Sequence, residues 1–292
     1  VSNGSDFISW TPIADWMGNH TTQYSGTFDG NNKTVSGLYF NGDSTCIGLF
    51  GSSESDGNIK NVGVVDSYFK GNDSVGGVCG NNAGTITNCY NAGNLTAIES
   101  SATIGGICGY NNGGTVTNCY NTGTVTATGQ VSSVGGVCGC STAPISNCYN
   151  TGSVTAASSD ADISGICGYY FGPITNCYYL ADTEDENGGK TAEQFKSGEV
   201  AYLLNGSKSE GDTVHFYQII GKDKAPVLDS THGVVYNGTT CTGIVYYTND
   251  KRKTTESHDW DENGFCKNDS AHYQPAIYSY SNVAYEISNA GN

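Results

Sequence analysis

Four tyrosines recur at a nearly constant spacing, and with the asparagines that follow them they are the residues best suited to bind a ligand. They are Tyr90, Tyr120, Tyr149 and Tyr178, 29 or 30 residues apart, with Asn91, Asn121 and Asn150 after the first three. Aromatic rings can stack on sugar rings, and amides can exchange hydrogen bonds with sugar hydroxyl groups. If exposed, the row could bind carbohydrate. Stacked identical side chains also stabilise a sheet without any ligand, and we favour this structural ladder.

Groups that could perform catalysis are scarce in the same stretch. Between residues 75 and 177 the only acids are Glu99, Asp160 and Asp162, and there is no Lys or Arg. Enzymes that cleave polysaccharides need paired carboxylates or a basic centre, and this stretch of the chain offers neither. The sequence also lacks the His-Glu-x-x-His and Gly-x-Ser-x-Gly motifs of zinc peptidases and serine hydrolases. We therefore expect no catalytic residues and no enzyme.

The elements that position these residues follow from a repeated phrase, Val/Ile-Gly-Gly-Val/Ile-Cys-Gly. It begins at Val75, Ile104, Val134 and Ile163, with serine in place of the first glycine in the last copy. A period of 29 or 30 residues is typical of solenoids, whereas propeller blades need about 40–50 residues. Three β-like runs, around Val78, Cys89 and Leu95, fit one turn between Asn and Gly breaks. The sequence predicts an all-β fold, a right-handed parallel β-helix (β-solenoid) with 29–30-residue turns.

Eight cysteines fall into two registers of this repeat. The first register holds Cys79, Cys108, Cys138 and Cys167, and the second holds Cys89, Cys119, Cys148 and Cys177. In stacked turns each register becomes a column, and free cysteine packs as a small hydrophobe. Neighbouring parallel strands point their Cβ atoms alongside one another rather than together, which disfavours disulfides. We favour reduced core ladders.

The composition limits the partners and the location. The net charge is −16, the isoelectric point is near 4.4 and only 14% of the residues are charged. Nucleic acids and anionic membranes need a basic face, so neither is expected as a partner. We find no apolar run long enough to span a membrane and no signal peptide. We expect a monomeric fragment of a longer protein that is secreted or displayed on a bacterial cell wall or cell surface.

The repeats resemble a known family. Gly-Gly-Val-Cys79-Gly-Asn-Asn, followed by Thr-Asn-Cys89-Tyr-Asn-Ala-Gly, is similar to the GLUG motif of bacterial cell-surface and adhesin-like proteins. The motif also occurs beside immunoglobulin A metallopeptidases. The resemblance covers about residues 28–180 and extends, through the segment that follows the repeats, to secreted proteins of Gram-positive type. It implies the β-solenoid architecture and says little about activity.

Both ends of the solenoid are predicted to carry caps. At the N-terminal end we expect Trp10, Trp16 and Phe28 to cover the core. At the other end a short helix is expected to lie over the last turn, with Thr191 and Gln194 forming a capping box. Its apolar positions are Phe195, Val200, Leu203 and Leu204. The predicted domains are 1–40 (N-terminal cap and lead-in), 41–182 (solenoid), 183–230 (helical cap and linker) and 231–292 (a small tail module, expected to be truncated).

The tail resembles a small module of similar surface proteins, in which a Cys-x-x-Cys pair normally follows Gly-Phe. Here Asp269 stands where the second cysteine would be. The resemblance implies a zinc site, for which the candidate ligands are Cys241, His258, Cys266 and His272. Three ligands and a weak fourth make a poor structural zinc site. We favour a Cys241–Cys266 disulfide or two free thiols, and thus no cofactor.

These observations together predict a non-enzymatic structural or adhesion segment that presents a β-solenoid to a host surface or matrix. Host glycans and extracellular-matrix or surface proteins are the expected partners. The first alternative is a carbohydrate-binding module that uses the Tyr/Asn row. The second is a carbohydrate-active enzyme whose chemistry lies outside the repeats.

Overall fold

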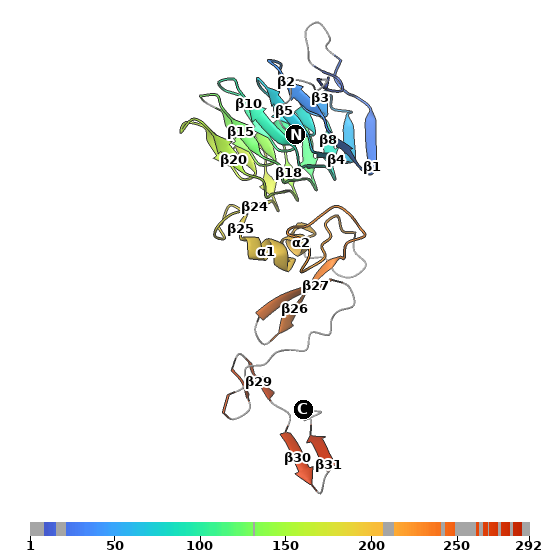
Figure 1. The fold of residues 1–292 in the computed structure, drawn as a ribbon, viewed down its shortest axis with the longest axis vertical. Coiled ribbons are helices and arrows are strands. Elements are labelled where there is room, and N and C mark those ends of the chain that lie inside the picture. The colour runs from blue at the N-terminus through green and yellow to red at the C-terminus, as the bar shows by residue number, and fades with distance from the viewer. Residues whose placement is uncertain are drawn as a thin grey trace.

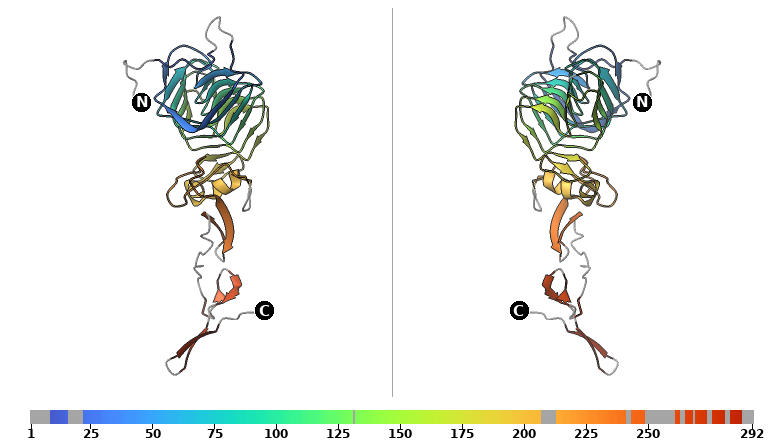
Figure 2. Two further views of the ribbon diagram at one scale, coloured as in Figure 1. Left: turned by 90° about the vertical axis from the view of Figure 1, so that its right-hand side faces the viewer. Right: turned by 90° about the vertical axis from the view of Figure 1, so that its left-hand side faces the viewer.

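The computed structural model describes residues 9–15, 22–130, 132–206, 213–240 and 243–248, and in the tail residues 261–262, 265–267, 269–273, 276–280 and 283–287. Figure 1 shows a stack of short strands in which successive turns follow one another from right to left. Two helices lie below the stack, and the hairpin β26–β27 follows them. Figure 2 shows the same turns from the two sides as superimposed loops. The predicted all-β solenoid is confirmed.

The second, third and fourth turns contribute five strands each, and the fifth contributes four, extended by one further strand. The first turn contains β3 (Phe50–Ser53), β4 (Asn58–Val65) and β5 (Tyr68–Gly71). It is preceded by β1 (Thr27–Ser36) and β2 (Tyr39–Asn41), which pair in parallel with β4 and β5 and so form part of an incomplete turn before it. The second contains β6 (Val75–Gly76), β7 (Cys79–Asn82), β8 (Thr85–Thr87), β9 (Tyr90–Asn91) and β10 (Asn94–Ala97). The third contains β11 (Thr103–Gly105), β12 (Cys108–Asn111), β13 (Thr115–Thr117), β14 (Tyr120–Asn121) and β15 (Val125–Ala127).

The last two turns repeat this order, and the C-terminal elements follow. The fourth turn contains β16 (Ser133–Gly135), β17 (Cys138–Ser141), β18 (Ile145–Ser146), β19 (Tyr149–Asn150) and β20 (Val154–Ala156). The fifth contains β21 (Asp162–Ser164), β22 (Cys167–Tyr170), β23 (Ile174–Thr175) and β24 (Tyr178–Leu180), extended by β25 (Gly189–Lys190). The helices are α1 (Ala192–Ser197) and α2 (Glu199–Leu204). The tail hairpins pair β26 (Val235–Thr240) with β27 (Gly243–Thr248), β28 (Phe265–Cys266) with β29 (Asp269–Tyr273), and β30 (Ala276–Tyr280) with β31 (Val283–Ile287).

Strands of successive turns pair in parallel and form the walls of the solenoid. The strand orders are β2-β5-β10-β15-β20, β21-β16-β11-β6 and β22-β17-β12-β7-β3, and β4 joins the β8 and β9 series in one larger sheet. The expectation of three strands per turn is wrong, because bends divide the runs. In the second turn Asn88 has φ +52°, a left-handed conformation that separates β8 from β9.

The interior is a dry column of small and branched side chains. Ile86, Val116 and Ile145 occupy one register and are each fully buried, and the cysteine registers lie beside them. At the N-terminal end Trp10 packs against this core and donates from Nε1 to the carbonyl of Gly48 over 3.1 Å. Phe28 meets Phe50 edge-on at 5.3 Å. Trp16 lies outside the described residues.

The predicted capping box is present at the start of α1. Thr191 Oγ1 accepts a hydrogen bond from the backbone of Gln194 over 3.3 Å, and Gln194 Oε1 accepts one from the backbone of Thr191 over 2.9 Å. Gly198, with φ +95°, ends α1 and makes two short helices of the single one expected.

The expected position of the helical cap is wrong. Phe195, Val200 and Leu204 pack with Phe216 against Tyr120 and Tyr149 on the side wall, rather than over the core of the last turn. Figure 1 shows α1 and α2 below the strands, alongside the stack. The stacked tyrosines offer these helices a continuous apolar surface, so the apolar helix faces are buried there.

A buried ammonium ties this cap to the solenoid. Lys190, only 9% exposed, forms ion pairs through Nζ with Glu184 and with Glu199, the latter at 3.1 Å. We expect Lys190→Met to reduce the free energy of unfolding by about 1–2 kcal/mol, because the partly buried carboxylate of Glu199 loses its cationic partner. Urea denaturation measures this change.

The matched control is Lys196→Met, which removes an exposed pair with Glu193. Exposed pairs contribute little, so its effect should stay within about 0.5 kcal/mol. Equal effects of the two substitutions would show that the Lys190 pairs do not hold the cap.

Candidate binding site at the tyrosine column

The four repeated tyrosines lie in register on β9, β14, β19 and β24. The rings of Tyr90 and Tyr120 are parallel within 2°, with centroids 4.8 Å apart. Those of Tyr120 and Tyr149 are parallel within 4° at 4.9 Å. We call Tyr90, Tyr120, Tyr149 and Tyr178 the tyrosine column.

Most of the tyrosine column is covered. Tyr149 is 1% exposed and Tyr120 is 7% exposed, because Phe195 and Phe216 pack over them. The hydroxyl of Tyr149 donates to the carbonyl oxygen of Pro226. The interpretation of these two tyrosines as an exposed sugar-binding row is therefore wrong. Tyr90 and Tyr178, at the two ends, are half-buried.

The asparagines that follow the tyrosines point into the core. Asn91 and Asn121 have no exposed surface, and Asn150 is 3% exposed. Asn91 Nδ2 donates to Asn121 Oδ1 over 2.9 Å, and Asn121 Nδ2 donates to Asn150 Oδ1 over 2.8 Å. Their assignment as ligand-binding residues is wrong, because strand alternation turns the residue after an outward tyrosine inward.

This amide ladder should be important for stability. Asn121 Nδ2 also donates to Gly123 O, and Asn121 Oδ1 accepts from Gly123 N. We expect Asn121→Leu to lower the free energy of unfolding by about 2–3 kcal/mol, since it leaves buried partners unsatisfied. Chemical denaturation tests this, with the exposed Asn112→Ala as the control. A near-neutral Asn121→Leu would mean that the ladder contributes little.

The two cysteine registers form columns inside the wall. Cys79, Cys108, Cys138 and Cys167 are paired in register, and all four have no exposed surface. The second column, Cys89, Cys119, Cys148 and Cys177, is likewise buried. All eight thiols are free. Seven of these thiols donate to backbone carbonyls, as Cys89 Sγ does to Thr87 O over 3.2 Å.

A polar cleft of about 480 Å³ lies at the Tyr90 end of the tyrosine column. It is lined by residues 31–33 of a bulge in β1, by 61–63 of β4, by Asn88 with the first two column tyrosines, and by 227–230 with His232. Position 63 is glycine in register with Tyr90, and a Cβ added there would lie 2.2 Å from Tyr90 Cζ. The tyrosine ring therefore occupies the space that a side chain at position 63 would fill.

Charged groups of the cleft come from distant segments. Asp229 accepts a hydrogen bond from the backbone N–H of Thr231 over 2.9 Å, which lowers the pKa of its carboxyl. His232 Nδ1 lies 2.6 Å from Asp223 Oδ2, which orients the imidazole. Lys33 adds one exposed ammonium. Sequence reasoning missed all three cleft residues, because no periodic signal joins residue 33 to residues 229 and 232.

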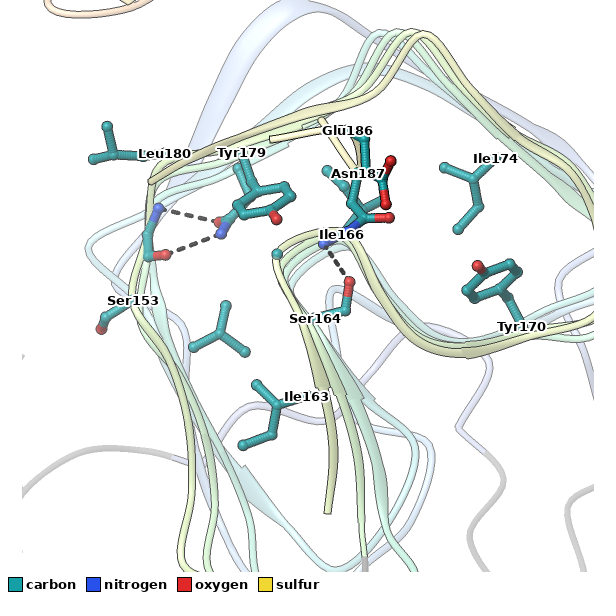
Figure 3. Close-up of a pocket in the computed structure, with 14 residues that line it drawn as sticks. Ser153, Ile163, Ser164, Ile166, Tyr170, Ile174, Tyr179, Leu180, Glu186 and Asn187 are labelled. Atoms are coloured by element: carbon teal, nitrogen blue, oxygen red, sulfur yellow. Dashed lines mark hydrogen bonds between the residues drawn. The ribbon is translucent and has the colours of Figure 1, made fainter. Parts of the chain in front are cut away.

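The second hollow is the open end of the last turn. Figure 3 shows Ile163, Ile166, Tyr170 and Ile174 around a groove of about 820 Å³, with Tyr179 at its rim. Ile163 is 48% exposed and Tyr170 is 56% exposed. This groove is the core cross-section that the expected helical cap would have covered.

Only two of the four candidate zinc ligands lie among the described residues. Cys241 and His258 lie outside the described residues, and Cys266 is 3% exposed at the edge of a short hairpin. His272 belongs to β29. Within the part of the chain that the structure describes, no three His, Cys, Asp or Glu side chains are grouped as a metal site. The expectation that the tail holds no zinc therefore stays a prediction.

The fold and the registers define a β-solenoid repeat protein. Residues 100–126 match the family model described as the GLUG motif, so the chain carries that motif, as its repeats predict. No helix among the described residues is long and apolar enough to cross a membrane.

Two known proteins resemble parts of the chain. Over 89 residues it is 33% identical to halomucin from Haloquadratum walsbyi, a match that spans 30% of this chain and 1% of that protein. A crystal structure from Bacteroides ovatus, described as a "putative immunoglobulin A1 protease", superimposes with a TM-score of 0.56 at 18% identity. That match covers 77% of this chain and 82% of the other. At this identity the likeness shows a shared fold and nothing about chemistry.

Proposed function

We propose that this chain is a non-enzymatic structural and adhesion segment of a longer bacterial protein, secreted or displayed at the cell surface. The observation that carries the proposal is how the solenoid uses its repeated residues. Cysteine, asparagine and branched side chains fill the interior as ladders, and the tyrosine column binds the chain's own cap. Most of the repeated residues therefore serve stability, as expected for a rigid spacer.

The surface supports a role in contact rather than in catalysis. Between residues 75 and 177 the wall carries three acids and no basic residue, and its outward positions are mainly Thr, Ser and Asn. Thr126 and Thr155, for example, pair across two turns at 3.2 Å between their hydroxyl oxygens. Such a neutral polar face suits host glycans or extracellular-matrix and surface proteins as partners, bound by a monomer.

The experiment is adhesion of the purified protein to immobilised matrix proteins and to host cells. Saturable binding by the folded chain supports the proposal. The matched control is the same protein unfolded in urea and captured at equal density. Absence of binding to every matrix and cell type would leave a spacer without adhesive function.

The enzyme alternative is tested separately. Incubation of the protein with immunoglobulin A1 and with plant and host polysaccharides should release no peptide and no reducing sugar. Turnover that persists after purification to homogeneity would overturn the non-enzymatic part of the proposal.

A further inference from the structure

The cleft beside Tyr90 has the components of a small-ligand site, although Tyr120 and Tyr149 in the middle of the tyrosine column are covered. Its volume of about 480 Å³ lies within the range of about 300–1,000 Å³ usual for such sites. It is formed where the β1 bulge and the segment 227–232 flank the first turns of the solenoid. The β1 bulge precedes the repeats and the segment 227–232 follows the helices, so the cleft forms only when both segments have packed against the solenoid.

Tyr90 differs from the other column members in its surroundings. The ring of Tyr90 stacks on Tyr120 and also fills the space beside Gly63, which the preceding turn places in register, so its edge and hydroxyl remain for the cleft. The residue remains half-buried and lines the cleft together with Tyr120. The edge of an aromatic ring can pack against the C–H groups of a sugar, and its hydroxyl can exchange a hydrogen bond with a sugar hydroxyl.

The polar lining offers donors and acceptors at several points. Asp229 supplies a carboxylate, His232 is oriented by Asp223, and Asn61 and Asn88 supply amides. Among the described residues, Asn88 Oδ1 is a buried acceptor without a hydrogen-bond partner. Asn88 Nδ2 donates to Asn61 Oδ1 over 3.0 Å, which fixes both amides in the lining of the cleft.

The charges select among ligand classes. Lys33 and Asp229 bring one charge of each sign, and the whole chain carries −16. A phosphate or sulfated ligand would meet one ammonium against a repelling surface. Neutral hydroxyl groups can accept from amides and donate to the carboxylate without any net charge requirement.

We propose that this cleft binds a short neutral oligosaccharide, with Tyr90 as the aromatic contact and Asp229 as the principal acceptor for sugar hydroxyls. The inference deepens the proposed function, since it assigns a ligand class and a site to adhesion, and it rests on that function. Tyr120 contributes to the site as the support of Tyr90, and Tyr149 and Tyr178 have no part in it.

The test is binding of the full chain to a glycan array, followed by calorimetric titration with the neutral oligosaccharides that bind best. Asp229→Ala removes the acceptor, and we expect at least a tenfold loss of affinity with an unchanged melting temperature. Gly63→Ala places a methyl group where the Tyr90 ring lies and should also abolish binding. Asp160→Ala, an exposed acid on the solenoid outside the cleft lining, is the matched control and should bind as the wild type does.

The possible results distinguish the saccharide site from the broader proposal of an adhesion function. No neutral glycan bound by the wild type, or full binding by Asp229→Ala and Gly63→Ala with preserved folding, overturns the saccharide site. Adhesion to matrix proteins with no glycan binding overturns the site alone and leaves the adhesion proposal standing. Binding only of anionic glycans or of peptides also contradicts it, because the ligand class is then wrong.

Discussion

The protein should lose stability steeply as the pH rises above about 8.5, where free thiols in an unfolded chain begin to ionise. Burial raises the pKa of five column thiols well above this value in the folded state, because a thiolate is poorly solvated in the dry core. They are Cys79, Cys89, Cys138, Cys148 and Cys167. Burial also raises the pKa of Cys46, to about 11.

The sign follows from proton linkage. A group whose folded pKa is raised stabilises the fold fully below its unfolded pKa, and this contribution is lost as the pH rises towards the folded pKa. Each thiol that stays protonated in the folded state and ionises in the unfolded state costs about 1.4 kcal/mol by pH 9.5, relative to neutral pH. Urea denaturation under reducing conditions between pH 7 and 9.5 measures the slope.

A single substitution separates the thiols from the general repulsion of an acidic chain. Cys138→Val keeps a buried apolar side chain of similar size and removes one titrating group. Its stability should fall about 1.4 kcal/mol less than that of the wild type between pH 7 and 9.5. The acidic surface is the same in both proteins, so parallel profiles would show that thiol burial does not govern the alkaline limit.

The repeat made the architecture and its registers predictable. The spacing of Cys79 and Cys108 fixes the length of a turn, and the same spacing places equivalent tyrosines above one another. The capping box at Thr191 was equally readable, since it depends on residues three apart. In both cases the structural feature depends on a fixed spacing between residues, which can be seen in the sequence.

The position of the cap was not readable in the same way. Phe195 and Phe216 have ordinary apolar neighbours in the sequence, and nothing there indicates that they pack on Tyr149, at least 46 residues earlier. Alternation assigned Tyr149 correctly to the outside of the strand, but an outward side chain is exposed only if no other segment covers it. The candidate cleft depends on the same docking, because it brings Asp229 beside Tyr90. Its residues therefore became visible only in the folded chain.

Replacement of Tyr149 by alanine should destabilise the fold severely, because this ring joins the solenoid wall to the cap. The ring is 1% exposed, stacks on Tyr120, and has Phe195 at 5.7 Å and Phe216 at 5.9 Å between ring centroids. Truncation of a buried aromatic side chain costs about 3–5 kcal/mol, because it leaves a cavity between the wall and the cap. We expect a loss of this size in urea denaturation, together with faster proteolysis within residues 183–230.

Two control variants divide this effect into its parts. Tyr149→Phe keeps the ring and removes only the hydrogen bond to Pro226, so it should cost about 1–2 kcal/mol. Tyr169→Ala removes a tyrosine that is 47% exposed on β22 and should change stability by less than about 0.5 kcal/mol. If Tyr149→Ala behaved like Tyr169→Ala, the cap would not be seated on the tyrosine column in solution. Tyr120 and Tyr149 would then be exposed, and the interpretation of the tyrosine column as a sugar-binding row would apply again.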